Sequence, residues 1–189
     1  MHLKGALHVH TTCSDGVLSV AETIAAHEAQ GFDFICLTDH DFIMRPGCYE
    51  AVKEVKTEML VFLGVELMYF ERGYVHISRI QGDRETLTIF NHPSELLLPL
   101  KKVLQRIEAV NRVVSLDAVE ITSRGYYTPE YDIREIMFPK VATDDSHEPH
   151  MIGRAWVEMD AKRSKDEIIA AIKAGDFWNC FLDKAARRR

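Results

Sequence analysis

The sequence predicts an α/β fold in which a mainly parallel sheet closes into a barrel with its helices outside. Strand and helix signals alternate along the chain, which is typical of strands joined by helices. Polar side chains follow almost every predicted strand, whereas an open sheet gathers them mainly at one switch point. No internal repeat or linker interrupts the 189 residues, so we expect a single domain over residues 1–189.

Strands are predicted where short apolar or alternating runs end at polar or turn-forming residues. Residues 32–37 form the most apolar of these runs and close at Thr38-Asp39-His40. Residues 59–68 form another strand, which is broken at Gly64. The remaining strand candidates are, in order, 6–10, 74–80, 87–90, 117–121, 140–143 and 155–158.

Helices are predicted where the spacing of apolar residues is helical and where stop or cap residues flank the segment. The first helix, 18–30, ends before a glycine, and the last runs from an N-cap at Ser164 to Gly175. The three other candidates are 48–58, 94–110 with a kink or restart at Pro99, and 130–137.

The composition is that of an ordinary soluble globular protein, with 47% hydrophobic and 28% charged residues. The net charge of -6 provides no general attraction to nucleic acid or to anionic membranes. The N-terminus lacks a signal-peptide pattern, and no apolar run approaches the roughly 20 residues that span a bilayer. The four cysteines (Cys13, Cys36, Cys48 and Cys180) form no CxxC pair, so we expect reduced thiols and a cytoplasmic protein.

Two short motifs place pairs of metal-binding groups on one face of the chain. His8 and His10 point the same way if their segment is a strand, because alternate side chains share a face. Asp145 and His147 have the same spacing, while Asp144 points away. Such imidazole and carboxylate pairs can hold first-row divalent metals. Taken alone, each pair is equally compatible with residues that bind nothing.

Other candidate ligands follow further predicted strands. His40 and Glu66 end two apolar strands, where a buried charged group needs a partner or a metal. Asp39 is expected to accept a hydrogen bond from a ligating imidazole, and Glu120 to lie behind the ligands or to contact substrate. Six of the nine histidines fall on strands or strand ends, a sorting that random placement would not give: His8, His10, His40, His76, His92 and His147.

This order of motifs resembles the PHP family, which is named for polymerase and histidinol phosphatase domains. The resemblance runs from His8 to about Arg154, most of the chain. The matching residues are HxH at His8 and His10, an acidic residue at Asp15, TDH at His40, GxE at Glu66, a strand histidine at His76, HP at His92, DxH at Asp145 and His147, and GR at Arg154.

The resemblance implies a distorted (β/α)7 TIM-like barrel that binds two or three divalent metal ions, commonly zinc, manganese or iron. In a trinuclear site of this kind, Glu66 would bridge two ions. The implied ligand groups are His8, His10, Glu66 and Asp145; Glu66, His76 and His92; and Asp15, His40 and His147.

A site of this kind implies hydrolysis of a phosphoester by metal-activated water. The sequence contains no C-x5-R phosphatase loop, GxSxG elbow or Walker A loop, so no covalent nucleophile is expected. Glu66 and Asp145 are the expected catalytic carboxylates, and Arg154 is the best candidate for a phosphate clamp, ahead of Arg45 and Arg124. The expected substrate is a small phosphorylated metabolite or nucleotide, with inorganic phosphate as a product.

Three alternatives compete with this interpretation. A metal-dependent nuclease acting on single-stranded ends uses the same chemistry, although the negative net charge argues against a nucleic-acid partner. A non-catalytic metal-binding module would keep the fold, but the complete set of ligands argues against it. An amidohydrolase with a carbamylated bridging lysine would need a lysine at a strand end, where only Lys140 is a candidate.

Overall fold

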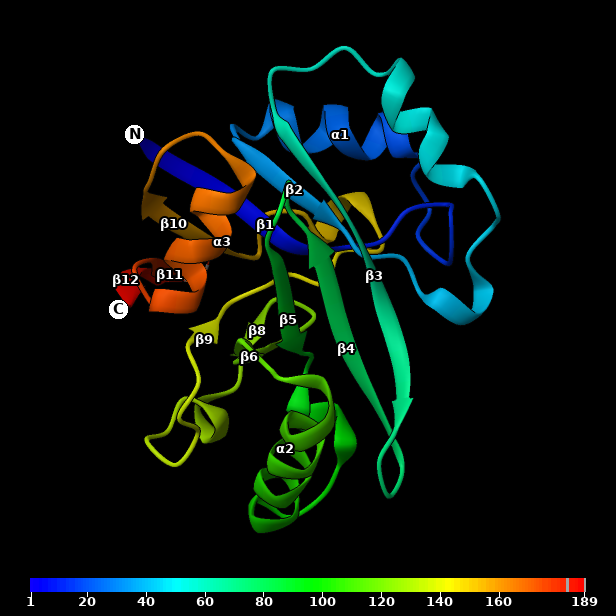
Figure 1. Ribbon diagram of the computed structural model, residues 1–189. Helices are drawn as coiled ribbons and strands as arrows, with labels where there is room; N and C mark the ends of the chain where they lie inside the picture. The colour runs from blue at the N-terminus through cyan, green and yellow to red at the C-terminus, as the bar shows by residue number, and fades with distance from the viewer. Residues whose placement is uncertain (183, 189) are drawn as a thin grey trace.

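The computed structural model describes residues 1–182 and 184–188, and within them the framework is one ten-stranded sheet (Figure 1). Its strands lie in the order β12-β11-β10-β1-β2-β3-β4-β5-β6-β9. Their bounds are β1 (His2–Val9), β2 (Phe34–Leu37), β3 (Leu60–Phe70), β4 (Tyr74–Gln81), β5 (Thr86–Phe90), β6 (Ala118–Glu120), β9 (Lys140–Val141), β10 (Ala155–Asp160), β11 (Trp178–Phe181) and β12 (Lys184–Arg188). A separate short hairpin pairs β7 (Thr122–Ser123) with β8 (Tyr126–Tyr127).

The sheet is nearly closed because the chain around β9 returns to the strands on the other side. Beyond β9, Ser146 bridges Val9 of β1 in parallel fashion, and its carbonyl accepts from the backbone N–H of His10 at 3.0 Å. The Asn179 side chain of β11 accepts from the Ala142 N–H at 2.6 Å and donates to the Lys140 carbonyl at 2.8 Å. These contacts make the sheet barrel-like, as the sequence predicts.

The sheet is mixed, so the prediction of a mainly parallel sheet is wrong. Five of its nine strand pairs are antiparallel, including β3 with β4 and β4 with β5. The connections 71–73 and 82–85 are too short for a parallel crossover, which takes a dozen or more residues. The described residues contain three α-helices, α1 (Val20–Ala29), α2 (Leu100–Val114) and α3 (Lys165–Ala174), so a count of seven strand–helix units is not confirmed.

The expected helices differ from the observed ones where proline and local turns intervene. The segment 94–110 is divided into the 3₁₀ helix η3 (Pro93–Leu96) and α2, which restarts after Pro99. The segment 48–58 holds the 3₁₀ helix η2 (Cys48–Glu54), and 130–137 contains only the end of η4 (Pro129–Tyr131). Helix α3 ends at Gly175 as expected, with φ at 76°, but the side chain of Ser164 makes no capping hydrogen bond.

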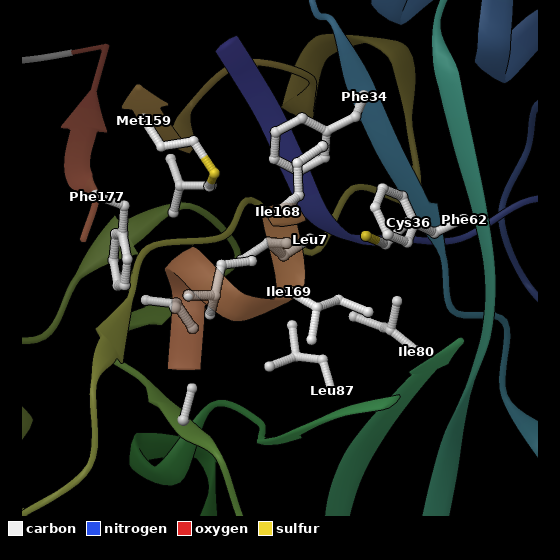
Figure 2. Packing of buried hydrophobic residues seen from close by; sticks show 14 of the residues in the cluster. Leu7, Phe34, Cys36, Phe62, Ile80, Leu87, Met159, Ile168, Ile169 and Phe177 are labelled. Carbon is white, nitrogen blue, oxygen red and sulfur yellow. The ribbon is translucent and has the colours of Figure 1, made fainter. Parts of the chain in front are cut away.

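Apolar side chains fill one end of the barrel, and α3 packs across that end. Figure 2 shows Ile168 and Ile169 of α3 against side chains that point inward from the strands. Phe34, Phe62 and Leu87 lie near the start of their strands, which leaves the opposite end of the barrel for polar groups. Helix α2 packs on the outer face of β4, β5 and β6, and α1 packs beside β1 and β2.

A β-bulge in β1 turns this strand from the core to the polar end of the barrel. Ala6 pairs with Ile35 and Val9 with Leu37, so β1 contains one extra residue between these pairs. Leu7 packs in the core cluster, whereas the next residue, His8, also faces the interior at the polar end. A bulge commonly re-aims side chains in this way next to a functional site.

A disulfide joins Cys13 to Cys48, so the prediction of four reduced thiols is wrong for these two residues. The Cα atoms lie 5.6 Å apart, and the bond ties the loop after β1 to η2. Cys36 and Cys180 are buried and, as expected, are not joined in a disulfide. No helix in the part of the chain that the structure describes is long and apolar enough to cross a membrane. The cytoplasmic location stays a prediction.

Candidate metal centre

The structure brings all nine predicted ligand residues together at the polar end of the barrel. They come from seven separate segments of the chain. His8 and His10 lie at the end of β1, Asp15 in the following loop, His40 after β2, Glu66 in β3, His76 in β4, His92 after β5, and Asp145 and His147 after β9. Glu66 lies within β3 rather than at its end, because β3 continues four residues farther to form a hairpin with β4.

Glu66 occupies the middle of the cluster. Its carboxylate oxygens lie within 3.5 Å of ring nitrogens from five histidines, of which His40 is nearest at 2.8 Å. The other four are His8, His10, His76 and His92. This residue is therefore placed to bridge two ions, as the family resemblance implies.

Two further carboxylates complete the cluster on either side. Asp145 Oδ1 lies 3.3 Å from Nε2 of both His8 and His10. Asp15 Oδ2 lies 3.4 Å from Nε2 of both His40 and His147. Asp144 instead points away, as predicted from strand alternation, and accepts from the Gly153 N–H at 2.8 Å.

Ligand atoms in three overlapping groups lie within 4.8 Å of one another. The groups are His8, His10 and Glu66; His40, Glu66 and His76; and His10, Asp15, His40 and His147. They differ from the groups implied by the resemblance because they lack Asp145 and His92 and because His10 and His40 each belong to two groups. Nδ1 of His40 faces Glu66 while its Nε2 faces Asp15.

Several nitrogen and oxygen atoms that could bind a metal are buried in the cluster and have no hydrogen-bond partner. They are Nδ1 of His10, His40 and His76, Oε2 of Glu66 and Oδ1 of Asp145. Buried polar atoms are nearly always satisfied, so five orphans in one cluster need an explanation. Imidazole nitrogens and carboxylate oxygens are the donors that zinc, manganese and iron accept, and the donor set therefore fits such ions.

The electrostatics of the cluster keep its carboxylates ionised. Burial alone would raise the pKa of Glu66, but the charge on His8 and the nearby ring nitrogens of His40 and His76, at 2.8 and 3.2 Å, hold that pKa far below its ordinary value. Burial likewise opposes ionisation of Asp145, whose pKa is nevertheless lowered by His8 and His10. These carboxylates are negative throughout the physiological pH range and are ready to bind cations.

Without a bound cation, the same contacts favour protons on the histidines. Burial lowers the pKa of His92, but the hydrogen bond to Glu66 and the charge of Glu120 raise it to about 9. The pKa of His8 is also raised, because Asp145, Glu120 and Glu66 outweigh its burial. Since a metal binds neutral imidazole, cation binding at this site must displace protons.

A second layer of polar groups orients the ligands. Glu120, which is 1% exposed, accepts from His8 Nδ1 at 2.8 Å, from the His92 N–H at 2.7 Å and from Thr143 Oγ1 at 2.7 Å. It thereby turns Nε2 of His8 toward the centre, which supports the predicted position behind the ligands. Asn91, which the sequence reasoning did not single out, donates to Glu66 Oε1 at 2.7 Å.

Asp39 was expected to accept a hydrogen bond from a ligating imidazole, but its carboxylate binds other groups. It organises the loop that carries Asp15. Its carboxylate accepts from the backbone N–H and the hydroxyl of Thr11 and of Ser14, at 2.6 to 3.0 Å. The Tyr49 hydroxyl donates to the same carboxylate at 3.0 Å. This loop is thus fixed by one buried acid as well as by the Cys13–Cys48 disulfide.

A cavity of about 520 Å³ opens over the cluster. Arg154 and Arg124 line it, as does His150, whereas Arg45 is not among its lining residues. Arg154 Nη1 donates to the Arg124 carbonyl at 3.4 Å, and its guanidinium lies 5.2 Å from the centre of the Tyr126 ring. Lys140 also lies elsewhere, donating to the Ile136 carbonyl at 2.9 Å, which leaves the amidohydrolase alternative without its bridging lysine.

A nearly closed barrel-like sheet with a rim of histidines and carboxylates defines a class of metal-binding α/β proteins. The chain belongs to the PHP domain family, whose model matches residues 6–173. This match confirms the resemblance drawn from the motifs.

Similar proteins agree with this assignment. A 5'-3' exoribonuclease from Haemophilus influenzae is 36% identical over 112 residues, which are 58% of this chain and 38% of that relative. A two-domain protein from Bacteroides vulgatus, containing a predicted PHP-like metal-dependent phosphoesterase, shares the fold at a TM-score of 0.67 and 20% identity. The alignment covers 96% of this chain and 65% of that one.

The fold also occurs in an amidohydrolase from Chromobacterium violaceum, solved with bound sulfate and no metal. That protein has a TM-score of 0.59 and 14% identity, covering 94% of this chain and 97% of its own. At this identity the likeness concerns the fold alone. This chain spans less than two thirds of the exoribonuclease and of the Bacteroides protein.

Proposed function

We propose that this chain hydrolyses a phosphoester with two or three divalent ions, zinc, manganese or iron, held by the nine residues at the rim. The observation that carries the proposal is the convergence of seven chain segments on one cluster. Five buried nitrogen and oxygen atoms of this cluster have no hydrogen-bond partner. Membership of the PHP family supports the same chemistry. The proposed substrate is a phosphorylated metabolite or nucleotide, and inorganic phosphate is a product when the ester is a monoester.

When bound, such ions would neutralise phosphoryl oxygens and lower the pKa of a coordinated water from about 15.7 toward 7. Glu66 would hold two ions at a fixed separation, because its two oxygens face different histidines. Asp145 would complete the group of His8 and His10, which its Oδ1 already approaches at 3.3 Å. Glu120 would keep the proton of His8 on Nδ1, away from the reacting atoms.

Arg154 is the proposed phosphate clamp. A guanidinium can donate two parallel hydrogen bonds to phosphate oxygens, and Arg154 lines the cavity over the cluster. The Tyr126 ring and the Arg124 carbonyl hold its side chain there. Arg124 is less suited to this role, because its Nε lies 3.8 Å from the carboxylate of Glu95.

Elemental analysis of the purified protein, combined with a panel of phosphomonoesters and phosphodiesters, tests the proposal. We expect two or three ions per chain and turnover that a chelator abolishes. Replacing His8 and His10 with alanine should remove turnover from a folded chain. Replacing His2, which pairs with Glu158 and Asp160 outside the cluster, is the matched control. Undiminished turnover in the double variant would show that the site is wrongly assigned.

A nuclease acting on single-stranded ends is the second candidate, and the exoribonuclease relative favours it. The negative net charge argues against a nucleic-acid substrate, but bound metal ions would weaken this argument. Two divalent ions would add +4 and three would add +6 to the formal charge of -6. Release of nucleotides from a single-stranded oligonucleotide, compared with hydrolysis of free mononucleotides, separates the two candidates.

A further inference from the structure

We propose that the β3–β4 hairpin and the start of α2 bind the tail of a single-stranded nucleic acid whose end lies at the metal centre. The inference rests on the second candidate function, a nuclease acting on single-stranded ends, and names the residues that would bind its substrate. The residues that would bind the tail are Phe70, Arg72, Tyr74, Lys102 and Arg106, together called the hairpin track. In Figure 1 the turn of this hairpin projects away from the rest of the sheet on the side where α2 lies.

The metal centre and the two aromatic residues of the hairpin track, Phe70 and Tyr74, share one face of the hairpin. Directly paired residues of an antiparallel ladder lie on the same face, and every second residue returns to it. Met68 pairs with His76, and Phe70 pairs with Tyr74. Glu66 and His76 belong to the metal centre, so Phe70 and Tyr74 continue its surface outward. Four residues of strand separate Phe70 from Glu66, a distance of about 13 Å.

Phe70 and Tyr74 form an aromatic ledge that the rest of the chain leaves exposed. Phe70 is 65% exposed and Tyr74 is 63% exposed. Their rings contact each other edge to face, with centroids 5.4 Å apart. Two large rings held in water beside a catalytic cluster provide stacking surfaces for bases, and such stacking tolerates any base sequence.

A cationic cavity of about 450 Å³ lies between the hairpin turn and α2. Arg72, Lys102 and Arg106 line it, and no acidic residue does. Arg106 Nη2 donates to the Arg72 carbonyl at 2.7 Å, which fixes one wall of the cavity. Among the described residues, Lys102 has no ion pair, whereas Glu71 lies 3.5 Å from Arg72 and Glu108 is bonded to Arg112.

This cavity lies on the side of the hairpin where α2 packs, opposite Phe70 and Tyr74, and two short stretches of chain connect it to the metal centre. Arg72 precedes His76 by four residues along the hairpin, and Pro99 follows His92 by seven residues through η3. A strand of a few nucleotides that follows Phe70 and Tyr74 would pass round the hairpin turn at Arg72 to reach the cavity, whereas a mononucleotide would stay at the centre. Aromatic rings followed by cations, of which Lys102 has no ion pair among the described residues, suit alternating bases and phosphates, whereas an acidic peptide would use only the cations.

Binding of a fluorescein-labelled twelve-nucleotide single strand, followed by anisotropy on the chelator-treated full chain, tests the hairpin track without turnover. Lys102→Ala should flatten the slope of log affinity against log salt by about 0.7, since one phosphate contact is lost. Tyr74→Ala should weaken binding at least about fivefold and leave the slope unchanged. Lys101→Ala is the matched control, because Lys101 is an exposed neighbour that does not line the cavity.

The metal-loaded enzyme provides the second readout. Lys102→Ala and Tyr74→Ala should lower kcat/KM for the oligonucleotide and leave hydrolysis of p-nitrophenyl phosphate unchanged. The hairpin track would be overturned if Lys101→Ala and Lys102→Ala had equal effects, or if Tyr74→Ala had none. It would also be overturned if poly-glutamate of the same charge displaced the labelled strand as well as an unlabelled strand does. Absence of metal-dependent p-nitrophenyl phosphate hydrolysis in every form would instead refute the proposed function, while the anisotropy result would still decide the track.

Discussion

Replacing Glu120 with glutamine is expected to weaken metal binding without touching a ligand. Glu120 accepts from His8 Nδ1 and Thr143 Oγ1 through one oxygen and from the His92 N–H through the other. Glutamine keeps the shape but can offer only one acceptor oxygen. Its amide group would face either the backbone N–H of His92 or the donors of His8 and Thr143, so at least one buried donor loses its partner.

The expected loss of metal affinity in Glu120→Gln is 10- to 100-fold, the usual effect of removing a carboxylate behind a ligating histidine. This loss corresponds to about 1.4 to 2.7 kcal/mol, which agrees with a cost of about 1–3 kcal/mol for one unsatisfied buried donor. Competition of the protein with a fluorescent zinc indicator measures the affinity, and circular dichroism checks folding. Glu108→Gln, on the exposed face of α2, is the control. A folded Glu120→Gln variant with wild-type affinity would refute the orienting role.

Three further predictions concern the clamp, a buried histidine and the disulfide. Arg154→Ala should lower kcat/KM for a phosphomonoester about 10- to 100-fold, since a charge-assisted hydrogen bond contributes about 1.5–3 kcal/mol, and Arg154→Lys should recover part of it. Burial lowers the pKa of His27 to about 4, so its contribution to stability is complete above its ordinary value of 6.5 and is lost as the pH falls toward 4. Urea titrations should therefore show that wild type loses about 3 kcal/mol of unfolding free energy relative to His27→Leu as the pH falls from 6.5 to about 4. Replacing Cys13 and Cys48 with serine should lower the unfolding free energy by about 3–4 kcal/mol, as should reduction by dithiothreitol.

Each of these predictions has an outcome that contradicts it. Equal activity of Arg154→Ala and wild type on every phosphoester would remove Arg154 from the site. A stability difference between wild type and His27→Leu that does not change with pH would mean that the pKa of His27 is the same in the folded and unfolded states. A urea midpoint unaffected by dithiothreitol would show that the Cys13–Cys48 bond does not form in solution.

The candidate site could be predicted from the sequence because metal ligands are specified by residue type and spacing. The HxH pair at His8 and the DxH pair at Asp145 were both predicted from the alternation of an extended chain. The structure holds Asp145 in the left-handed region, with φ at 48°, so alternation is not what orients this second pair. The choice of Asp145 over Asp144 followed from the same alternation, and the structure places Asp144 away from the cluster with its carboxylate on the Gly153 N–H. Motif order then identified the family, which composition could not.

The direction of the strands was predicted less well, although the connection lengths contained a signal. Residues 71–73 leave no room for a helix between β3 and β4, so an antiparallel hairpin was the only short connection available. The extra residue in β1, the roles of Asn91 and Asp39, and the Cys13–Cys48 bond arise from contacts between distant segments. Local sequence patterns do not predict contacts between distant segments, and two cysteines without CxxC spacing do not by themselves indicate a disulfide.

Anomalous diffraction from crystals of the metal-loaded protein would show where the ions bind relative to the nine residues at the rim. Data collected on either side of the zinc, manganese or iron edge would locate each ion relative to the ligand atoms. We predict two or three peaks, each about 2.0 to 2.2 Å from imidazole nitrogens and carboxylate oxygens of the cluster, with Glu66 contacting two of them. Peaks located away from Glu66, Asp145 and Asp15, or no peak in protein that hydrolyses phosphoesters, would contradict this prediction.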